Sequence, residues 1–80
     1  DDKNYLFEGK TSLKDFYRIV DVNEDEWENA KGEAETLAGF ILEISGNFPK
    51  KNQKIAFSNV TFTVESLDKK RIKQIKVTLL

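Results

Sequence analysis

Cysteine and histidine are both missing from this 80-residue sequence, which narrows the chemistry that it can carry. Without cysteine there is no disulfide framework, no thiolate zinc site and no thiol nucleophile. Without histidine the chain lacks the commonest metal ligand and the commonest general base near neutral pH. The remaining carboxylates, lysines, tyrosines and hydroxyls show no nucleophile paired with its base. The composition therefore predicts a protein that is not an enzyme.

Long apolar runs and clusters of glycine are missing too. The longest apolar stretch, residues 37–44, falls far short of the roughly 20 residues that span a bilayer. The four glycines, at positions 9, 32, 39 and 46, are too far apart to form a phosphate-binding loop. Small secreted domains usually depend on disulfides, so the missing cysteine favours a reducing compartment. These gaps predict a soluble chain without a nucleotide-binding loop.

An acidic segment covers residues 21–35 and begins like a calcium-binding loop, with oxygen-bearing side chains at loop positions one, three and five. The sixth position is Glu26, where that loop needs glycine, and the twelfth is Gly32, where it needs glutamate. We therefore expect a solvated surface loop with room for one helical turn, and no metal site. Its one large apolar residue, Trp27, either folds back onto the core or marks a contact surface.

The charges are unevenly distributed along the chain. Residues 1–49 carry 12 acidic and 5 basic side chains, which gives −7. Residues 50–80 carry 2 acidic and 8 basic side chains, which gives +6, and the two halves sum to the net charge of −1. This division predicts either opposed charged faces or an internal complementarity of the two halves, and opposed faces would suit docking to a partner.

Two segments show the apolar spacing of short helices. The first is predicted over residues 13–20, where Ser12 supplies a capping box at the start. The second is predicted over residues 37–44, and Gly46 provides its left-handed stop. Gly39 lies inside this second helix, where it costs about 1 kcal/mol relative to alanine. Such a residue often permits a close backbone approach, here to a strand.

Residues 5–7 form a short apolar run that ends at Gly9, and residues 55–57, 60–64 and 75–79 alternate apolar and polar side chains; both patterns are typical of strands. The first of these reads as an edge strand, and the middle two form a hairpin. Ile72 is out of phase with the last strand, which predicts either a bulge or a late strand start near Lys73. Eighty residues suffice for one domain only. The predicted fold class is therefore α+β: a short N-terminal strand and two helices packed on an antiparallel β-meander.

A basic stretch near the C-terminus is the main candidate interaction surface, and it consists of Lys69, Lys70, Arg71, Lys73 and Lys76. Such a stripe attracts phosphate, but no aromatic side chain lies on the polar face of the last strand to stack a base. A charged edge strand that resists aggregation accounts for the same residues. We therefore expect a docking surface here and not a nucleic-acid site, with Trp27 and its acidic neighbours as a second surface.

The order of these pieces resembles the CorC/HlyC transporter-associated domain over essentially the whole chain. The pieces that carry the resemblance are Tyr5–Gly9, Ser12–Val20, Thr36–Phe40, Gly46–Pro49, Phe62–Val64 and Asp68–Ile72. The most specific part is the Thr-Leu-Ala-Gly segment, which is followed ten residues on by Pro49. One departure is Asn52, in a turn where the family usually has glycine; asparagine tolerates the left-handed conformation, so we expect the turn to survive.

The resemblance implies a context for the chain. Residues 1–80 would be one domain excised from the C-terminus of a larger membrane protein, after a membrane-embedded domain and a CBS-domain pair. It would lie on the cytoplasmic side of the bacterial inner membrane. The implied parents are magnesium and cobalt efflux proteins, hemolysins or gliding-motility proteins, and the implied role is a regulatory or interaction module.

The resemblance also implies partners and one alternative function. The partners would be the CBS pair and the membrane domain of the same parent, with a homodimer and an anionic membrane surface as further candidates. The implied fold is similar to part of the PCMH-type FAD-binding domain. The alternative is therefore a module that binds flavin or an adenine nucleotide, although no cofactor is predicted from the residues themselves.

Overall fold

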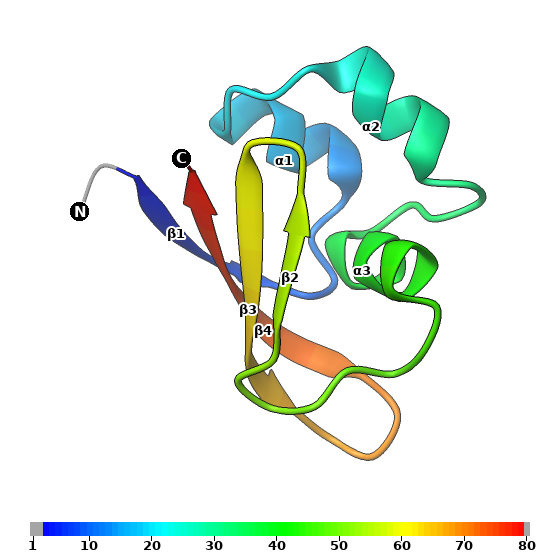
Figure 1. The fold of residues 1–80 in the computed structure, drawn as a ribbon, viewed down its shortest axis with the longest axis vertical. Helices are drawn as coiled ribbons and strands as arrows, with labels where there is room; N and C mark the ends of the chain where they lie inside the picture. The colour runs from blue at the N-terminus through cyan, green and yellow to red at the C-terminus, as the bar shows by residue number, and fades with distance from the viewer. Residues whose placement is uncertain (1–2, 80) are drawn as a thin grey trace.

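The computed structural model describes residues 3–79, which form an antiparallel sheet covered on one face by helices (Figure 1). The elements in chain order are β1 (Asn4–Glu8), α1 (Leu13–Ile19), α2 (Glu24–Ala30), α3 (Leu37–Ser45), β2 (Lys54–Phe57), β3 (Val60–Leu67) and β4 (Ile72–Leu79). The four strands lie in the order β1-β4-β3-β2. The prediction of an α+β fold with an N-terminal edge strand is confirmed, and β1 joins the meander beside β4.

Both predicted helices are confirmed, and each begins at its own capping residue. The Ser12 hydroxyl accepts a hydrogen bond of 3.1 Å from the backbone N–H of Asp15 at the start of α1. Thr36 does the same for the N–H of Gly39 at the start of α3. Gly46 ends α3 in the left-handed conformation, with φ of 78°. Helix ends leave backbone groups unpaired, and these caps satisfy some of them.

The prediction of only two helices is wrong, because the acidic segment contains α2. Its N-cap is Asn23, whose side-chain oxygen accepts a hydrogen bond from the N–H of Glu26 at 3.2 Å. The three acidic residues of its first turn are placed favourably against the helix dipole. Trp27 is the one buried residue of this helix, so its sequence has no apolar stripe by which the helix could be recognised.

The predicted hairpin and bulge are confirmed. Ser58 adopts a positive φ of 56° in the two-residue connection between β2 and β3. Farther along, the register between β3 and β4 shifts on either side of Ser66, which pairs with Gln74. The shift leaves Lys73 without a partner on β3, and it allows both Ile72 and Ile75 to reach the core.

Trp27 lies at the centre of the core, between the helices and the sheet. Its ring is stacked on Phe40 of α3 at 4.4 Å between centroids, and it lies 5.0 Å from Phe16 of α1. Edge contacts reach Phe57 and Phe62 of the sheet. The other buried apolar side chains are Phe7, Leu13, Val20, Leu37, Ile41, Val60, Val64, Ile72, Ile75 and Val77. The first of the two expectations for Trp27 is therefore correct: it folds back onto the core.

The close approach expected at Gly39 exists, but its partner was predicted wrongly. A Cβ atom on Gly39 would lie 3.4 Å from the Cβ of Ala34, which belongs to the segment before α3 and not to a strand. The glycine that does meet a strand is Gly9. A Cβ atom there would overlap the carbonyl oxygen of Ile72 and would lie 3.1 Å from the Cβ of Ala38.

Candidate functional site

A groove of about 500 Å³ separates the start of α3 from the start of β4 and from the β1–α1 connection. We call it the basic groove. It is lined by Glu8, Gly9, Lys10, Thr36, Ala38, Gly39, Leu42, Lys70, Arg71, Ile72 and Lys73. Leu42 is exposed to 38% although it is a large apolar side chain. Small residues and aliphatic groups form its floor, and charged side chains form its rim.

Gly9 builds the floor of the basic groove by joining three elements. Its N–H donates to the carbonyl oxygen of Lys73 at 2.8 Å, and its own carbonyl oxygen accepts from the N–H of Ala38 at 2.9 Å. The strand β1, the strand β4 and the helix α3 therefore meet at one residue. The lack of a side chain at Gly9 lets them approach closely enough to leave a shallow floor.

The turn between β3 and β4 is held by Asp68. One of its carboxylate oxygens accepts hydrogen bonds from the backbone N–H groups of Lys70 at 3.0 Å and of Arg71 at 2.9 Å. The pKa of Asp68 lies below its usual value, chiefly because of the hydrogen bond from the Lys70 N–H. The hydrogen bond from the Arg71 N–H and the nearby Arg71 charge lower it as well. The turn therefore presents its cations from a fixed backbone.

The rim of the basic groove has an excess of positive charge. The Nε atom of Arg71 lies 3.5 Å from Asp68, and Lys10 lies 3.4 Å from Glu8. Lys70 and Lys73 are exposed and have no ion pair within residues 3–79. Two free ammonium groups beside an exposed leucine suit a ligand that combines carboxylates with an apolar group.

The start of α3 faces the basic groove but offers no free donor to a phosphate. The N–H of Leu37 donates to the carbonyl oxygen of Thr11, and that of Ala38 donates to Gly9. The N–H of Gly39 donates to the Thr36 hydroxyl, and that of Phe40 to the Thr36 carbonyl oxygen. A helix N-terminus binds anions through unpaired N–H groups. Here all four are occupied, so this helix end is not a nucleotide cradle.

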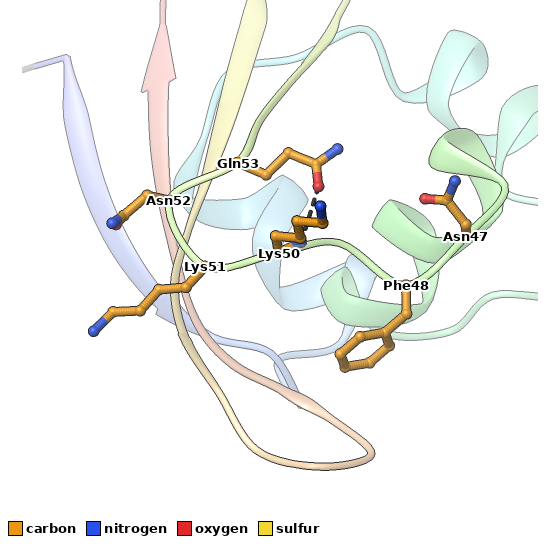
Figure 2. A pocket seen from close by; sticks show the side chains of 6 residues that line it. All are labelled: Asn47, Phe48, Lys50, Lys51, Asn52 and Gln53. Atoms are coloured by element: carbon orange, nitrogen blue, oxygen red, sulfur yellow. Dashed lines mark hydrogen bonds between the residues drawn. The ribbon is translucent and has the colours of Figure 1, made fainter.

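A second hollow, of about 570 Å³, lies along the connection between α3 and β2 (Figure 2). Its lining residues are Asn47, Phe48, Lys50, Lys51, Asn52 and Gln53. Asn52 adopts a positive φ of 68°, as expected for the position where the family usually has glycine. The Gln53 side chain accepts a hydrogen bond from the N–H of Lys50 at 2.9 Å, drawn as the dashed line in Figure 2. The loop is therefore ordered and rich in cations.

The structure brings together only part of the predicted interaction surface. Lys70, Arg71 and Lys73 line the basic groove, and Lys69 lies beside them in the same turn. Lys76 pairs with Leu6 and Thr63 in the sheet and lies outside the groove. Trp27 has no exposed surface, so the prediction that it anchors a contact is wrong.

Several residues of the two hollows were missed by sequence reasoning. The sequence indicates Gly9 only as the end of a strand, and it indicates Phe48 only as part of the segment that resembles the family. Leu42 lies outside the apolar face of α3, and this position on the helix is the one signal in the sequence that its side chain is exposed.

The acidic side of the domain contains a paired phenol. The hydroxyl of Tyr17 on α1 donates to the carboxylate of Glu28 on α2 at 2.7 Å. Burial of the phenol, followed by this hydrogen bond and by the charges of Glu28 and Glu24, raises the pKa of Tyr17 above its ordinary value. The folded state therefore keeps the proton at a pH where the unfolded chain has begun to lose it.

The free energy of unfolding is therefore expected to fall as the pH rises above about 10, the ordinary pKa of tyrosine. Tyr17 contributes its full stability below that pH and loses it progressively above. Urea unfolding of the wild type and of Tyr17→Phe at pH 8 and pH 11 measures this, because the variant lacks the Tyr17 part of the decline. Equal declines in both proteins would show that the Tyr17–Glu28 contact does not stabilise the fold.

Metal and membrane features are lacking in the part of the chain that the structure describes. Within residues 3–79, no three carboxylates come together in a group able to hold a metal ion. None of the helices over the same residues is both long and apolar enough to cross a bilayer.

The structure defines a small α+β domain with helices on one face of an antiparallel sheet, and comparison with known proteins identifies its family. The sequence matches the CorC/HlyC transporter-associated domain over residues 1–80, and the chain belongs to this family. The solved transporter-associated domain of a CBS domain protein from Porphyromonas gingivalis is 37% identical, with a TM-score of 0.86. That similarity covers 99% of this chain and 91% of the other.

Curated relatives are considerably longer than this chain. The polyamine export protein of Salmonella typhimurium is 34% identical over 80 residues, which is 100% of this chain and 17% of that protein. The magnesium and cobalt efflux protein CorC of Pasteurella multocida is 27% identical over 75 residues, or 94% of this chain and 23% of that protein. The resemblance found in the sequence is thereby confirmed, and polyamine export is a relative's role that the sequence did not suggest.

Proposed function

We propose that this domain is a non-catalytic regulatory module of a membrane protein that exports cations. It docks through the basic groove onto an acidic segment of the CBS-domain pair or the membrane domain of its own parent, on the cytoplasmic side. The parent's cargo is a divalent metal ion or a polyamine, the classes for which the relatives are named. The observation that carries the proposal is the groove itself, where free Lys70 and Lys73 flank the exposed Leu42.

The chemistry of the groove favours a protein segment over a nucleotide. Carboxylates of the segment would pair with the two free ammonium groups, and an apolar side chain would cover Leu42. A phosphate ligand would need unpaired N–H groups, and those at the start of α3 are occupied. Docking of this kind steers association electrostatically and depends on ionic strength.

The proposal is tested by binding in trans. The 80-residue domain is added to its parent protein lacking these residues, held in detergent, and the affinity is measured at low and high salt. The double variant Lys70→Glu and Lys73→Glu is expected to bind at least about tenfold more weakly, since charge reversal turns attraction into repulsion. The double variant Lys54→Glu and Lys76→Glu changes two exposed lysines of the sheet outside the groove and alters the net charge by the same amount. It is the matched control and should bind like the wild type.

Three outcomes would contradict this function. If the groove variant bound with wild-type affinity, the groove would not be part of the contact. If the control lost as much affinity as the groove variant, net charge alone would explain the effect. Saturable binding of FAD, AMP or ATP by the isolated domain, with no binding to the parent, would favour the cofactor module instead.

A further inference from the structure

A second basic surface lies at one end of the sheet and shares Lys70 and Arg71 with the rim of the basic groove. It consists of the loop at residues 46–53 and the β3–β4 turn at residues 68–71, which we call the tip. The backbone N–H of Asn52 donates to the Val64 carbonyl oxygen at 2.6 Å, and that of Val64 donates to Gln53 at 3.0 Å. These bonds attach the loop to the half of β3 that leads into the turn, and Figure 1 shows both segments at the same end of the molecule.

The tip is strongly cationic. Its basic residues are Lys50, Lys51, Lys69, Lys70 and Arg71, against Asp68 as its single acid, so 5 − 1 gives +4. All five cations are exposed, and the acid is already occupied by Arg71 and by backbone N–H groups. Helix α2 and its acidic turn lie at the other end of the molecule in Figure 1. The domain is therefore electrostatically polar along its length.

An aromatic side chain stands among these cations. Phe48 is exposed to 43%, and within residues 3–79 no other aromatic side chain is as open to solvent. Its neighbour Pro49 is fully buried and anchors the loop to the core. The hydroxyl of Ser45 donates to the Asn47 carbonyl oxygen at 2.7 Å, on the other side of Phe48. The neighbours of Phe48 are thus held in place on both sides, which reduces the cost of ordering the loop on binding.

We propose that the tip binds the surface of an anionic lipid bilayer, with Phe48 in the interfacial layer and the lysines at the phosphates. Phe is one of the apolar side chains that interfacial segments bury at the boundary between headgroups and acyl chains, beside Lys and Arg on the polar side. Each Lys or Arg near an anionic bilayer contributes about 1 kcal/mol, which is about fivefold in affinity. A single-stranded nucleic acid would need a row of stacking rings, and the tip has one.

This binding supplements the proposed function, because a domain tethered to a membrane protein meets the bilayer at high effective concentration. A weak lipid contact is then sufficient to orient it. The acidic end faces away from the anionic surface, so the same contact fixes which way the basic groove points.

The test uses the 80-residue chain and sucrose-loaded vesicles, with no part of the parent present. Cosedimentation is measured with phosphatidylcholine alone and with phosphatidylcholine mixed with phosphatidylglycerol. The wild type is expected to bind only the anionic vesicles, and high salt is expected to weaken the binding. Replacing both Lys50→Gln and Lys51→Gln should reduce the partition coefficient by about 25-fold, and Phe48→Ser by about tenfold.

Ile19→Ser is the matched control for Phe48→Ser. Ile19 is also a large apolar side chain, exposed to 56%, but it lies at the end of α1 beside the acidic segment. The control should bind vesicles like the wild type. All variants change exposed side chains, and their thermal unfolding should match the wild type within a few degrees.

Three results would overturn the lipid assignment: no binding to anionic vesicles, equal binding to neutral ones, or binding that is indifferent to Phe48. Binding of soluble polyglutamate as tightly as vesicles would assign the tip to acidic proteins instead. Because the parent is absent, failure here leaves docking through the basic groove untouched, and failure of that docking leaves this result untouched.

Discussion

Trp27→Ala is expected to lose about 4 kcal/mol of unfolding free energy, which is at least a third of what an 80-residue domain possesses. Truncation of a buried Trp or Phe to Ala costs about 3–5 kcal/mol, and a domain of this length has roughly 4–12 kcal/mol in total. Trp27 contacts rings from two helices and two strands, so the cavity would open between the layers where no single element can collapse into it. The melting temperature should fall by about 15–30 °C.

Urea unfolding followed by far-ultraviolet circular dichroism measures this loss, since the variant has no tryptophan to report fluorescence. Trp27→Phe should cost much less, because a ring remains against Phe40 and the buried Nε1–H, which has no hydrogen-bond partner, is removed. Ile19→Ala is the surface control and should change stability by less than about 0.5 kcal/mol. A loss below about 1.5 kcal/mol in Trp27→Ala would show that the two layers can close over the gap.

Gly9→Ala is expected to be the second most damaging change, at about 3 kcal/mol. The added methyl group would overlap the carbonyl oxygen of Ile72, which is backbone and cannot rotate away. Relief requires β4 to separate from the β1–α1 connection, which strains the hydrogen bonds of Gly9 to Lys73 and Ala38. Overpacking of this kind typically costs about 1–3 kcal/mol, and the lack of a flexible neighbour places this site at the upper end.

Gly46→Ala separates steric overlap from conformational strain. Gly46 has a positive φ of 78°, but a Cβ atom there would meet nothing within 4 Å. Its substitution should therefore cost only the left-handed penalty, about 1–2 kcal/mol. Thermal unfolding of both variants compares the two effects directly. If Gly46→Ala proved the more destabilising, the contact between Gly9 and Ile72 would not limit packing.

Local patterns in the sequence were sufficient for most elements. The stripes of α1 and α3 repeat at helical spacing, and each has a capping residue before it, so two independent signals agree. Ile72 lies out of phase with the strand that follows, and a bulge is the physical way to bury it together with Ile75.

The features that the sequence did not predict are those that depend on tertiary contacts. Helix α2 buries one residue, Trp27, so no periodicity in the sequence indicates this helix. The ring is buried only because four other elements surround it. The basic groove is assembled from segments around residues 9, 39 and 72. Its floor exists because backbones meet at Gly9, and the sequence contains no local sign of that contact. The cations of the turn and the exposure of Leu42 were each predictable, but their meeting in one groove was not.

The strand order described above also governs how the chain reaches its native state. β4, the last strand to be synthesised, lies in the interior of the sheet and is the only neighbour of β1. The side chains of Asn4 and Thr78, 74 residues apart in sequence, are joined by a hydrogen bond of 2.8 Å. Closing so long a loop has a large entropic cost that local contacts cannot offset early. On the ribosome, β1 must therefore wait unpaired until nearly the whole domain has emerged, and the emergence of β4 times the closure of the sheet.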